Sequence, residues 1–397
     1  MTDQKRLHIA LLTDTFLPHA GGSRFYYYNL FRRVSAHQDV LVLTTKIPGW
    51  QDFDAREQTA SFRIKRRFKP LRDLSYSQLP KLAGTMMRAL ELAMKRPDIL
   101  HCGDLYPPAL IGVMLKRVFG IPFVAYSHGE DFTLTSGRRY QSKVRNLIYR
   151  SADAVVANGT FAVEKLVEIG ISQKKIFKIT PGLDTKVFFP QSSDELRPRY
   201  GLGSELVVMT VARVVPQKGH SRVIRAIAAL GDDVPPLKYI IAGRGAHEKA
   251  LRELAEELGV QDKVIFAGFI PEAELNLHYN LADVVVMPNL QTEGGDIEGF
   301  GMVFLEANAA GKPVIGGRSG GTADAVADGV TGYLVDSEND EDLIEKLRRL
   351  LTDRDLRNTM GAAGLRRAQT EFSWEPRAAL LSRINSEITG ANESEPQ

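Results

Sequence analysis

Residues 293–321 read EGGDIEGFGMVFLEANAAGKPVIGGRSGG, and this stretch decides the fold class. The glycines on either side of Phe300 predict a turn into a helix that runs from about Met302 to Ala310. The apolar run PVIGG at 313–317 predicts a strand directly after that helix, and DVVVMP at 283–288 predicts a strand before it. A helix between two such strands is the repeating unit of a parallel sheet with helices on both faces.

The same alternation of short apolar runs and helical patterns covers nearly the whole chain. The runs are rich in Val and Ile, which is typical of strands buried on both faces of a sheet. The chain is therefore expected to be an α/β protein with doubly wound sheets. The remaining strands that the pattern predicts are residues 8–13, 39–45, 98–102, 122–127, 153–158, 175–180, 205–211, 237–243, 264–268 and 332–335.

A length of 397 residues predicts two domains. The break is expected near residues 182–205, which are rich in Pro, Ser, Gly and charge and have little periodicity. We expect an N-terminal domain over residues 1–190 and a C-terminal domain over residues 191–373. No strand remains locally for a final helix at about 374–390 to cover, so this helix is expected to pack back on the first domain.

Charge is distributed unevenly along the chain. Residues 1–150 contain 24 Lys and Arg against 12 Asp and Glu, whereas residues 151–397 contain 27 against 36. This excess predicts either a solvated basic face or a surface for an anionic partner such as a phospholipid membrane. The basic residues are densest at Arg63, Lys65, Arg66, Arg67, Lys69, Arg72, Arg138, Arg139, Lys143, Arg145 and Arg150.

Composition disfavours several classes of protein. Nucleic-acid binding is not expected, because the chain has neither zinc-finger spacing nor the aromatic run of an RNA-binding domain. No stretch has the roughly 20 apolar residues that span a bilayer, and the N-terminal apolar run is too short for a signal peptide. The single cysteine, Cys102, has no partner for an internal disulfide. We expect a cytoplasmic protein and, if its basic surface binds lipid, attachment to the inner face of the cytoplasmic membrane.

Two motifs in the first half follow predicted strands. Gly21 and Gly22 precede a helix near Ser23, where free backbone N–H groups can bind a phosphate. An ordinary glycine turn is the alternative. His128 lies in SHGED, residues 127–131, at the edge where open α/β sheets bind ligands. From the residues alone, a catalytic His128 and a structural one both stay open.

Arg213 and Lys218 lie in the loop after the first strand of the second half. Two cations five residues apart in such a loop suit a diphosphate, although two solvated charges would have the same spacing. The next strand ends at Gly243, in the sequence GRG. This is a partial match to a dinucleotide-binding fingerprint.

Two carboxylates in the opening stretch complete the candidate site. Glu298 is expected in the loop before the helix and Glu306 about one turn inside it. The backbone N–H groups from about Phe300 to Val303 are placed to bind phosphate oxygens. A carboxylate can accept the paired hydroxyls of a sugar. Because acids beside a phosphate repel it unless sugar hydroxyls lie between them, a phosphorylated sugar is predicted.

These motifs closely resemble the retaining nucleotide-sugar glycosyltransferases of glycosyltransferase family 4. The resemblance implies the GT-B fold, in which two Rossmann-like domains face each other across a cleft. The donor-site block is most similar to bacterial mannosyltransferases that act on phosphatidylinositol mannosides. The similar segments span the chain and are HAGG at 19–22, SHGED at 127–131, PGLDTKVFFP at 181–190, ARVVPQKG at 212–219, EGFGMVFLE at 298–306, SGGTADAVADGVTGYLV at 319–335 and FSW at 372–374.

The resemblance also implies roles for the site residues. His128 and Glu298 would be catalytic, with both contacting the transferred sugar, and Glu306 would bind the ribose. Arg213 and Lys218 would neutralise the diphosphate leaving group. The remaining substrate-binding residues would be Gly22, Gly243, Gly299, Phe300 and Gly301. No metal and no cofactor are expected, since family members of this kind generally need no bound metal at the reacting centre and the nucleoside-diphosphate sugar is the donor substrate.

The chain departs from the family after HAGG, where Val-Glu is common. Here Ser23, Arg24 and the aromatic run Phe25–Tyr28 follow, and this segment is expected close to the acceptor side. The acceptor, a glycan or a lipid, therefore stays open, as do the donor base and the hexose, which could be mannose or glucose. The alternatives are a soluble-acceptor glycosyltransferase, a nucleotide-sugar epimerase, a sugar phosphorylase and a binding module without turnover.

Overall fold

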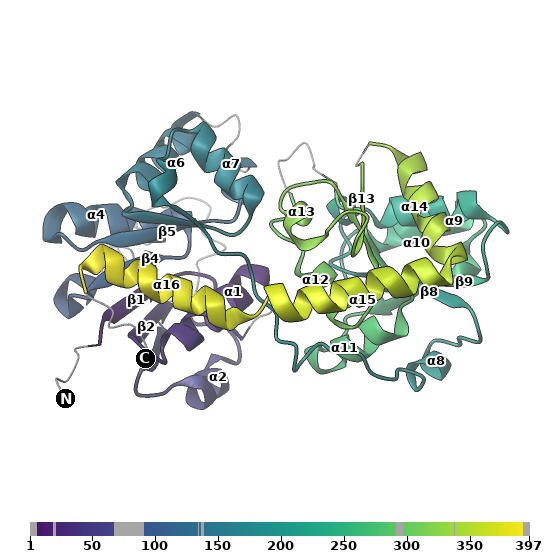
Figure 1. Ribbon diagram of the computed structural model, residues 1–397, viewed down its shortest axis with the longest axis horizontal. Helices are drawn as coiled ribbons and strands as arrows, with labels where there is room; N and C mark the ends of the chain where they lie inside the picture. The colour runs from purple at the N-terminus through teal and green to yellow at the C-terminus, as the bar shows by residue number, and fades with distance from the viewer. Residues whose placement is uncertain are drawn as a thin grey trace. The chain divides into compact units, whose positions relative to one another are not determined.

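The computed structural model describes residues 6–18, 21–66, 91–133, 135, 139–290, 297–336 and 338–391. The chain divides into two compact units, each built on a parallel sheet of its own (Figure 1). Unit 1 comprises Met1–Gly182 and Trp374–Gln397, and unit 2 comprises Leu183–Ser373.

Unit 1 contains a seven-stranded parallel sheet in the order β3-β2-β1-β4-β5-β6-β7. Both faces are covered, so alternate residues of one strand enter different cores: Ile9 and Leu11 enter one, Ala10 and Leu12 the other. The strand order reverses between β1 and β4, where ligands of doubly wound sheets bind. The strands are β1 (His8–Leu12), β2 (Asp39–Thr44), β3 (Phe62–Arg66), β4 (Ile99–Cys102), β5 (Phe123–Ser127), β6 (Ala154–Ala157) and β7 (Ile176–Lys178).

Helices lie on both faces of this sheet (Figure 1). The helices on one face are α1 (Gly22–Val34), α2 (Trp50–Glu57) and α16 (Trp374–Thr389). Those on the other face are η1 (Leu105–Ala109), α4 (Leu110–Phe119), α5 (Glu130–Thr133), α6 (Arg139–Ser151) and α7 (Thr160–Glu168). A short turn, η2 (Gln173–Lys175), precedes β7.

Helix α16 follows unit 2 in the chain but packs on α1 of unit 1 (Figure 1). Its Asn385 is buried, with Oδ1 lying 3.0 Å from Nε2 of His101 in β4 and its amide donating to Oε1 of Gln38 at 2.9 Å. The amide of Gln38 donates in turn to the Ser382 carbonyl at 3.1 Å. Together with the buried Trp374, this network fixes α16 against the sheet.

Unit 2 has the same strand order in a six-stranded parallel sheet, β10-β9-β8-β11-β12-β13. Its strands are β8 (Leu206–Val211), β9 (Leu237–Ala242), β10 (Val264–Gly268), β11 (Val284–Met287), β12 (Val314–Gly317) and β13 (Gly332–Val335). The helices on one face are α9 (His220–Leu230), α10 (Glu248–Glu257) and α14 (Asp340–Thr352). Those on the other are α8 (Leu196–Arg199), α11 (Glu272–Leu281), α12 (Met302–Ala309), α13 (Thr322–Ala325) and α15 (Arg354–Glu371). Two short turns are η3 (Pro216–Lys218) and η4 (Gln261–Lys263).

Each strand that the sequence predicts is present, and the strand orders confirm an α/β protein with two doubly wound sheets. Strand β3 is not predicted, because Arg63, Lys65 and Arg66 interrupt the apolar pattern of FRIKR. Unit 2 begins at Leu183 rather than at residue 191, since Leu183 and Phe188 pack in its core. Within the described part of the chain, no helix is both long and apolar enough to cross a membrane.

Candidate active site

Glycines let the loops after the strands of unit 2 approach one another closely. A Cβ atom on Gly243, directly after β9, would lie 1.8 Å from the carbonyl oxygen of Ala212, directly after β8. A Cβ atom on Gly321 would lie 2.1 Å from the carbonyl oxygen of Gly299, and the Gly321 N–H donates to the Glu298 carbonyl at 2.9 Å. These loops therefore form packed pairs at the carboxyl edge of the sheet, and Gly243 is required there by backbone packing.

An ion pair joins two of the predicted donor-site residues. Lys218, the last residue of η3, donates to Oε2 of Glu298 at 2.5 Å, and both side chains are partly buried. Arg213 is exposed in the same loop, and its carbonyl oxygen lies 3.2 Å from Nε2 of His220. The other ring nitrogen of His220 lies 3.2 Å from the Tyr239 hydroxyl. Burial lowers the pKa of His220 to about 4, so a neutral histidine anchors the loop that carries both cations.

Helix α12 begins immediately after this carboxylate. Its N-cap, Gly301, has a left-handed φ of 90°, and a Cβ atom there would lie 2.5 Å from the Phe304 ring. Phe300 is buried edge-to-face against Phe372, with ring centroids 6.1 Å apart, which fixes the turn. The first turn of α12 has no acidic residue, so its backbone N–H groups and the helix dipole favour an anion.

Glu306 lies further along α12 and contacts α11. The hydroxyl of Tyr279 donates to Oε2 of Glu306 at 2.6 Å. Burial raises the pKa of Glu306 to about 7, the charge of Glu272 adds to this rise, and the hydrogen bond from Tyr279 opposes it. Near neutral pH this group is therefore divided between its acid and carboxylate forms.

In unit 1, Gly21 and Gly22 form the start of α1, directly after the β1 loop. Gly22 is exposed, and a Cβ atom on it would contact nothing within 4 Å. No internal packing therefore requires glycine at this position. The first turn of α1 also has no acidic residue, so the helix dipole there favours an anion. Because Gly22 has no side chain, an anion can approach the backbone N–H groups of this turn.

His128 follows β5 and contacts two aromatic residues of α1. Its Nε2 lies 2.7 Å from the hydroxyl of Tyr27, and the ring of Tyr26 packs edge-to-face at 5.7 Å. The Tyr27 hydroxyl donates to the Gly103 carbonyl, so its oxygen accepts from Nε2–H of His128. Burial lowers the pKa of His128 to about 4, which leaves a neutral ring with Nδ1 as an acceptor.

Asp131 of the same SHGED motif has a structural role. Its carboxylate accepts from the hydroxyl of Tyr149 at 2.6 Å, from the hydroxyl of Ser127 at 3.1 Å, and from the Gly129 N–H at 3.0 Å. It thereby holds the turn that presents His128.

Two residues near His128 are missing from the sequence prediction. Tyr27 is one, since nothing local indicates its contact with a residue that lies 101 positions later. Asp104 is the other: it accepts from the Thr13 hydroxyl at 2.7 Å and from the Asp14 N–H at 2.6 Å, which joins the ends of β1 and β4. Its position directly after a predicted strand was the available signal.

The aromatic run Phe25–Tyr28 lies in the first half of α1. Tyr26 and Tyr27 are buried in the core of unit 1. The Tyr28 hydroxyl donates to Oε2 of Glu57 at 2.5 Å. Helix α1 turns Tyr26 and Tyr27 toward the sheet, and the expected position of this run close to the acceptor side stays a prediction.

The basic residues predicted to form one surface are partly buried and partly exposed. Arg66 is buried and donates to Asp54 at 2.9 Å, and Arg145 is buried with its guanidinium 4.4 Å from the Phe132 ring centroid. Lys65 pairs with Glu91. The exposed members of the set are Arg63, Arg139, Lys143 and Arg150. Arg67, Lys69, Arg72 and Arg138 lie outside the described residues.

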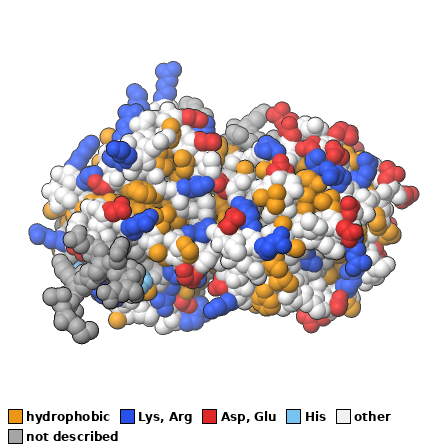
Figure 2. Space-filling model, in the orientation of Figure 1, with side chains coloured by type: hydrophobic (Ala, Val, Ile, Leu, Met, Phe, Trp, Pro, Cys, Tyr) orange, Lys and Arg blue, Asp and Glu red, His pale blue; other side chains and the backbone are white. Residues whose placement is uncertain are grey.

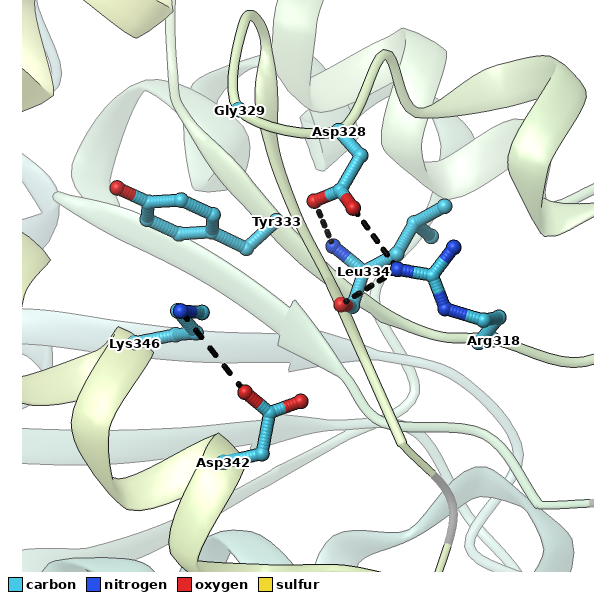
Figure 3. A pocket seen from close by; sticks show the side chains of 7 residues that line it. All are labelled: Arg318, Asp328, Gly329, Tyr333, Leu334, Asp342 and Lys346. Carbon is cyan, nitrogen blue, oxygen red and sulfur yellow. Dashed lines mark hydrogen bonds and ion pairs between the residues drawn. The ribbon is translucent and has the colours of Figure 1, made fainter.

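A pocket of about 340 Å³ lies elsewhere in unit 2, at the edge strand β13 (Figure 3). Its charged residues are occupied with one another: Arg318 donates to Asp328 at 2.8 Å, and Lys346 lies 3.9 Å from Asp342. None of the predicted site residues lines it. Among the residues that the structure describes, no group of three His, Cys, Asp or Glu side chains is arranged to hold a metal ion.

Two family models match the chain, one in each half. The model described as Glycosyltransferase Family 4 matches residues 20–187, and Glycosyl transferases group 1 matches residues 192–367. The GDP-mannose-dependent alpha-(1-6)-phosphatidylinositol monomannoside mannosyltransferase of Mycolicibacterium smegmatis is 31% identical over 379 residues, covering 95% of this chain and 97% of the relative. The chain belongs to glycosyltransferase family 4. This glycosyltransferase is also 32% identical over 337 residues to the D-inositol 3-phosphate glycosyltransferase of Corynebacterium glutamicum, covering 80% and 78% of the two chains.

Solved structures show that this glycosyltransferase has the GT-B fold of two Rossmann-like domains. HepE from Anabaena, crystallised with UDP and glucose, superposes with a TM-score of 0.79 at 19% identity, covering 96% of this chain and all of that one. Sucrose-phosphate synthase from Thermosynechococcus elongatus superposes with a TM-score of 0.79 at 23% identity, covering 98% of this chain and all of that one. These similarities establish the fold alone.

Proposed function

We propose that this glycosyltransferase transfers mannose from GDP-mannose to an inositol-containing phospholipid, with retention of configuration and without a catalytic metal. The observation that carries the proposal is the Lys218–Glu298 ion pair directly before α12, because it puts a phosphate-binding cation beside a sugar-binding carboxylate. The M. smegmatis relative supports the choice of donor and acceptor, since its name specifies GDP-mannose and phosphatidylinositol monomannoside.

Unit 2 is proposed to bind the diphosphate of the donor. Lys218 has three N–H groups, so it can keep Glu298 and also contact a phosphate oxygen. Arg213 and the start of α12 supply further positive charge. As the bond between the sugar C1 and the diphosphate oxygen breaks, these groups stabilise the negative charge that develops on the leaving group. The acceptor hydroxyl oxygen forms the new bond to C1, and its proton leaves with the diphosphate.

The remaining site residues are proposed to hold the sugars of the donor. Glu298 would accept from hydroxyls of the mannose, and Glu306 would accept from the ribose hydroxyls. The neutral His128 would contact the transferred mannose through Nδ1, whose acceptor role follows from the Tyr27 contact. Gly22 would admit a donor phosphate to the N–H groups of α1.

A phospholipid acceptor implies that the enzyme works at a membrane surface, and we propose the inner face of the cytoplasmic membrane. A water-soluble inositol phosphate is the second candidate acceptor. It is favoured by the C. glutamicum relative, whose name specifies D-inositol 3-phosphate. The two acceptors share an inositol ring and a phosphate, so one acceptor-binding site could recognise either.

A donor and acceptor panel tests the proposal. GDP-mannose, GDP-glucose, UDP-glucose and UDP-galactose are each incubated with phosphatidylinositol vesicles, with inositol phosphate, or with neither, and nucleoside diphosphate release is measured. We expect release from GDP-mannose with phosphatidylinositol, and an α-linked product by NMR. Release that favours a UDP-sugar would refute the donor assignment. Release with inositol phosphate alone would select the second acceptor. Lys218→Ala, which is expected to bind the diphosphate more weakly, is the control and should show reduced release.

A further inference from the structure

Unit 1 carries a continuous apolar stripe on the solvent side of α4. Leu110, Met114 and Val118 recur every fourth residue, so they lie on one face of the helix, and all three are exposed. Val118 is 66% exposed and the adjacent Phe119 54% exposed. Large apolar side chains on the outside of a helix that already buries its opposite face indicate a partner that covers them.

Helix α6 lies beside α4 and extends this surface. Tyr140, Lys143, Leu147 and Arg150 follow helical spacing along its exposed side, and Tyr140 is 79% exposed. The hydroxyl of Tyr106, just before α4, donates to the Gln141 carbonyl of α6 at 2.9 Å, which ties the start of one helix to the other.

The charged residues of α4 and α6 are all cations. Neither helix contains an Asp or a Glu. Lys116 is occupied by Asp153 at 2.7 Å, and Arg145 is buried. The cations that stay exposed on these helices are Arg117, Arg139, Lys143 and Arg150. Figure 2 shows Lys and Arg side chains interspersed with hydrophobic ones, and some Asp and Glu, on the part of unit 1 that carries α4 and α6.

We propose that the α4–α6 face docks on the surface of an anionic phospholipid membrane. Exposed apolar side chains that can enter the interface, on helices whose charged residues are all cations, match the chemistry of such a surface. A second copy of the chain fits poorly, because two faces of the same positive charge would repel. This docking surface goes beyond the proposed function, because it assigns named residues of α4 and α6 to the membrane contact.

The topology relates this face to the proposed reaction. Helix α4 follows β4 and α6 follows the β5–α5 segment, so both helices start at the carboxyl edge of the sheet, where His128 lies. Leu110 and Tyr140, at the beginnings of the two helices, are the members of the face nearest that edge. A membrane against α4 and α6 would therefore lie alongside the edge that carries His128, which is the arrangement a lipid acceptor requires.

Vesicle flotation without donor or acceptor tests the docking surface, so that its outcome is independent of the proposed activity. The probes are vesicles of phosphatidylcholine alone and of phosphatidylcholine with phosphatidylglycerol. We expect binding only to the anionic vesicles, with a decrease at high salt. The variant R117Q/R139Q/K143Q/R150Q should lose binding by about a hundredfold or more, at about fivefold for each cation removed. M114Q/V118Q/F119Q should weaken binding at high and low salt alike.

The matched control is R225Q/K249Q/R354Q/R366Q, which removes the same charge from exposed positions of unit 2 and should bind as the wild type does. An unchanged circular dichroism spectrum and an unchanged thermal unfolding curve show that a variant is folded. If the fourfold α4–α6 variant fails to fold, the single variants Arg117→Gln and Lys143→Gln replace it. Equal binding of the α4–α6 variant and its control, or binding to neutral vesicles alone, would overturn the proposal. So would a dimer in sedimentation that only the α4–α6 variant abolishes.

Discussion

The hydroxyl of Tyr27 lies 2.7 Å from Nε2 of His128 and donates its own proton to the carbonyl of Gly103. The carbonyl can only accept, so the tyrosine oxygen must accept from Nε2–H, and this fixes one tautomer of the neutral ring. Tyr27 is thus a positioning residue. It determines which nitrogen of His128 is an acceptor.

Tyr27→Phe should lower turnover by about tenfold while leaving nucleoside diphosphate affinity unchanged, because it removes one hydrogen bond to His128. The pH dependence of kcat should also shift, since the ring loses the partner that fixed its tautomer. Tyr26→Phe is the control, as its hydroxyl donates to the Ile179 carbonyl at 2.9 Å and does not contact His128. Equal effects of the two substitutions would assign Tyr27 a packing role only.

Lys218→Ala should weaken nucleoside diphosphate binding by roughly 1.5–3 kcal/mol, the usual range for a hydrogen bond to a charged group. Glu298→Gln should instead reduce turnover more than diphosphate affinity, because its carboxylate is assigned to the sugar. Calorimetry with the bare diphosphate and steady-state kinetics on both variants measure the two effects. An equal loss of affinity in both would contradict this division of roles.

Glu306→Gln should change the pH dependence of donor binding. In the free enzyme the pKa of Glu306 is raised to about 7, so the fraction that is a carboxylate increases as pH rises through 7. Nucleoside diphosphate affinity is therefore expected to increase over this range in the wild type and to change less in the variant. Calorimetric titrations from pH 6 to pH 8 compare the two proteins directly. If affinity changes with pH in the same way in both proteins, Glu306 does not bind the ribose.

Gly22→Ala should leave stability unchanged and lower activity. The added methyl group meets no protein atom within 4 Å, so only a ligand phosphate close to the backbone would be affected. Gly243→Ala is expected to behave oppositely and to destabilise unit 2, since its Cβ atom would lie 1.8 Å from a carbonyl oxygen. Thermal melting and activity assays on both variants distinguish them. If the Gly22→Ala enzyme is fully active, no donor phosphate lies against the backbone at Gly22.

Acid should destabilise unit 1 through His101. Burial lowers its pKa from 6.5 to about 3, so the unfolded chain binds a proton that the folded chain excludes. Protonation of His101 in the unfolded chain does not change the free energy of unfolding above pH 6.5. As the pH falls from 6.5 toward 3, it lowers the free energy of unfolding by up to about 4–5 kcal/mol. His101→Gln should flatten the slope of unfolding free energy against pH. A slope equal to that of the wild type would exclude His101 as the source.

The sequence predicts elements well where the determining contacts are local. The glycine turn into α12 and the cations after β8 could be found because a short segment specifies each. Strand β3 could not be found, because the sequence alone predicts that Arg66 is a surface cation. Its burial depends on the ion pair with Asp54, which no local pattern indicates. The same limit applies to Tyr27: the sheet and α1 bring it to His128, and no spacing in the sequence encodes that contact.

The return of α16 to unit 1 affects the order in which the chain can fold during synthesis. Residues 183–373 leave the ribosome before Trp374–Thr389, so unit 2 can fold while α1 and β4 still lack the helix that covers them. Until α16 emerges, the apolar side chains of α1 and the polar groups of Gln38 and His101 have no cover from it. A nascent chain stalled before residue 374 should therefore expose unit 1 to chaperones or proteases while unit 2 is already native.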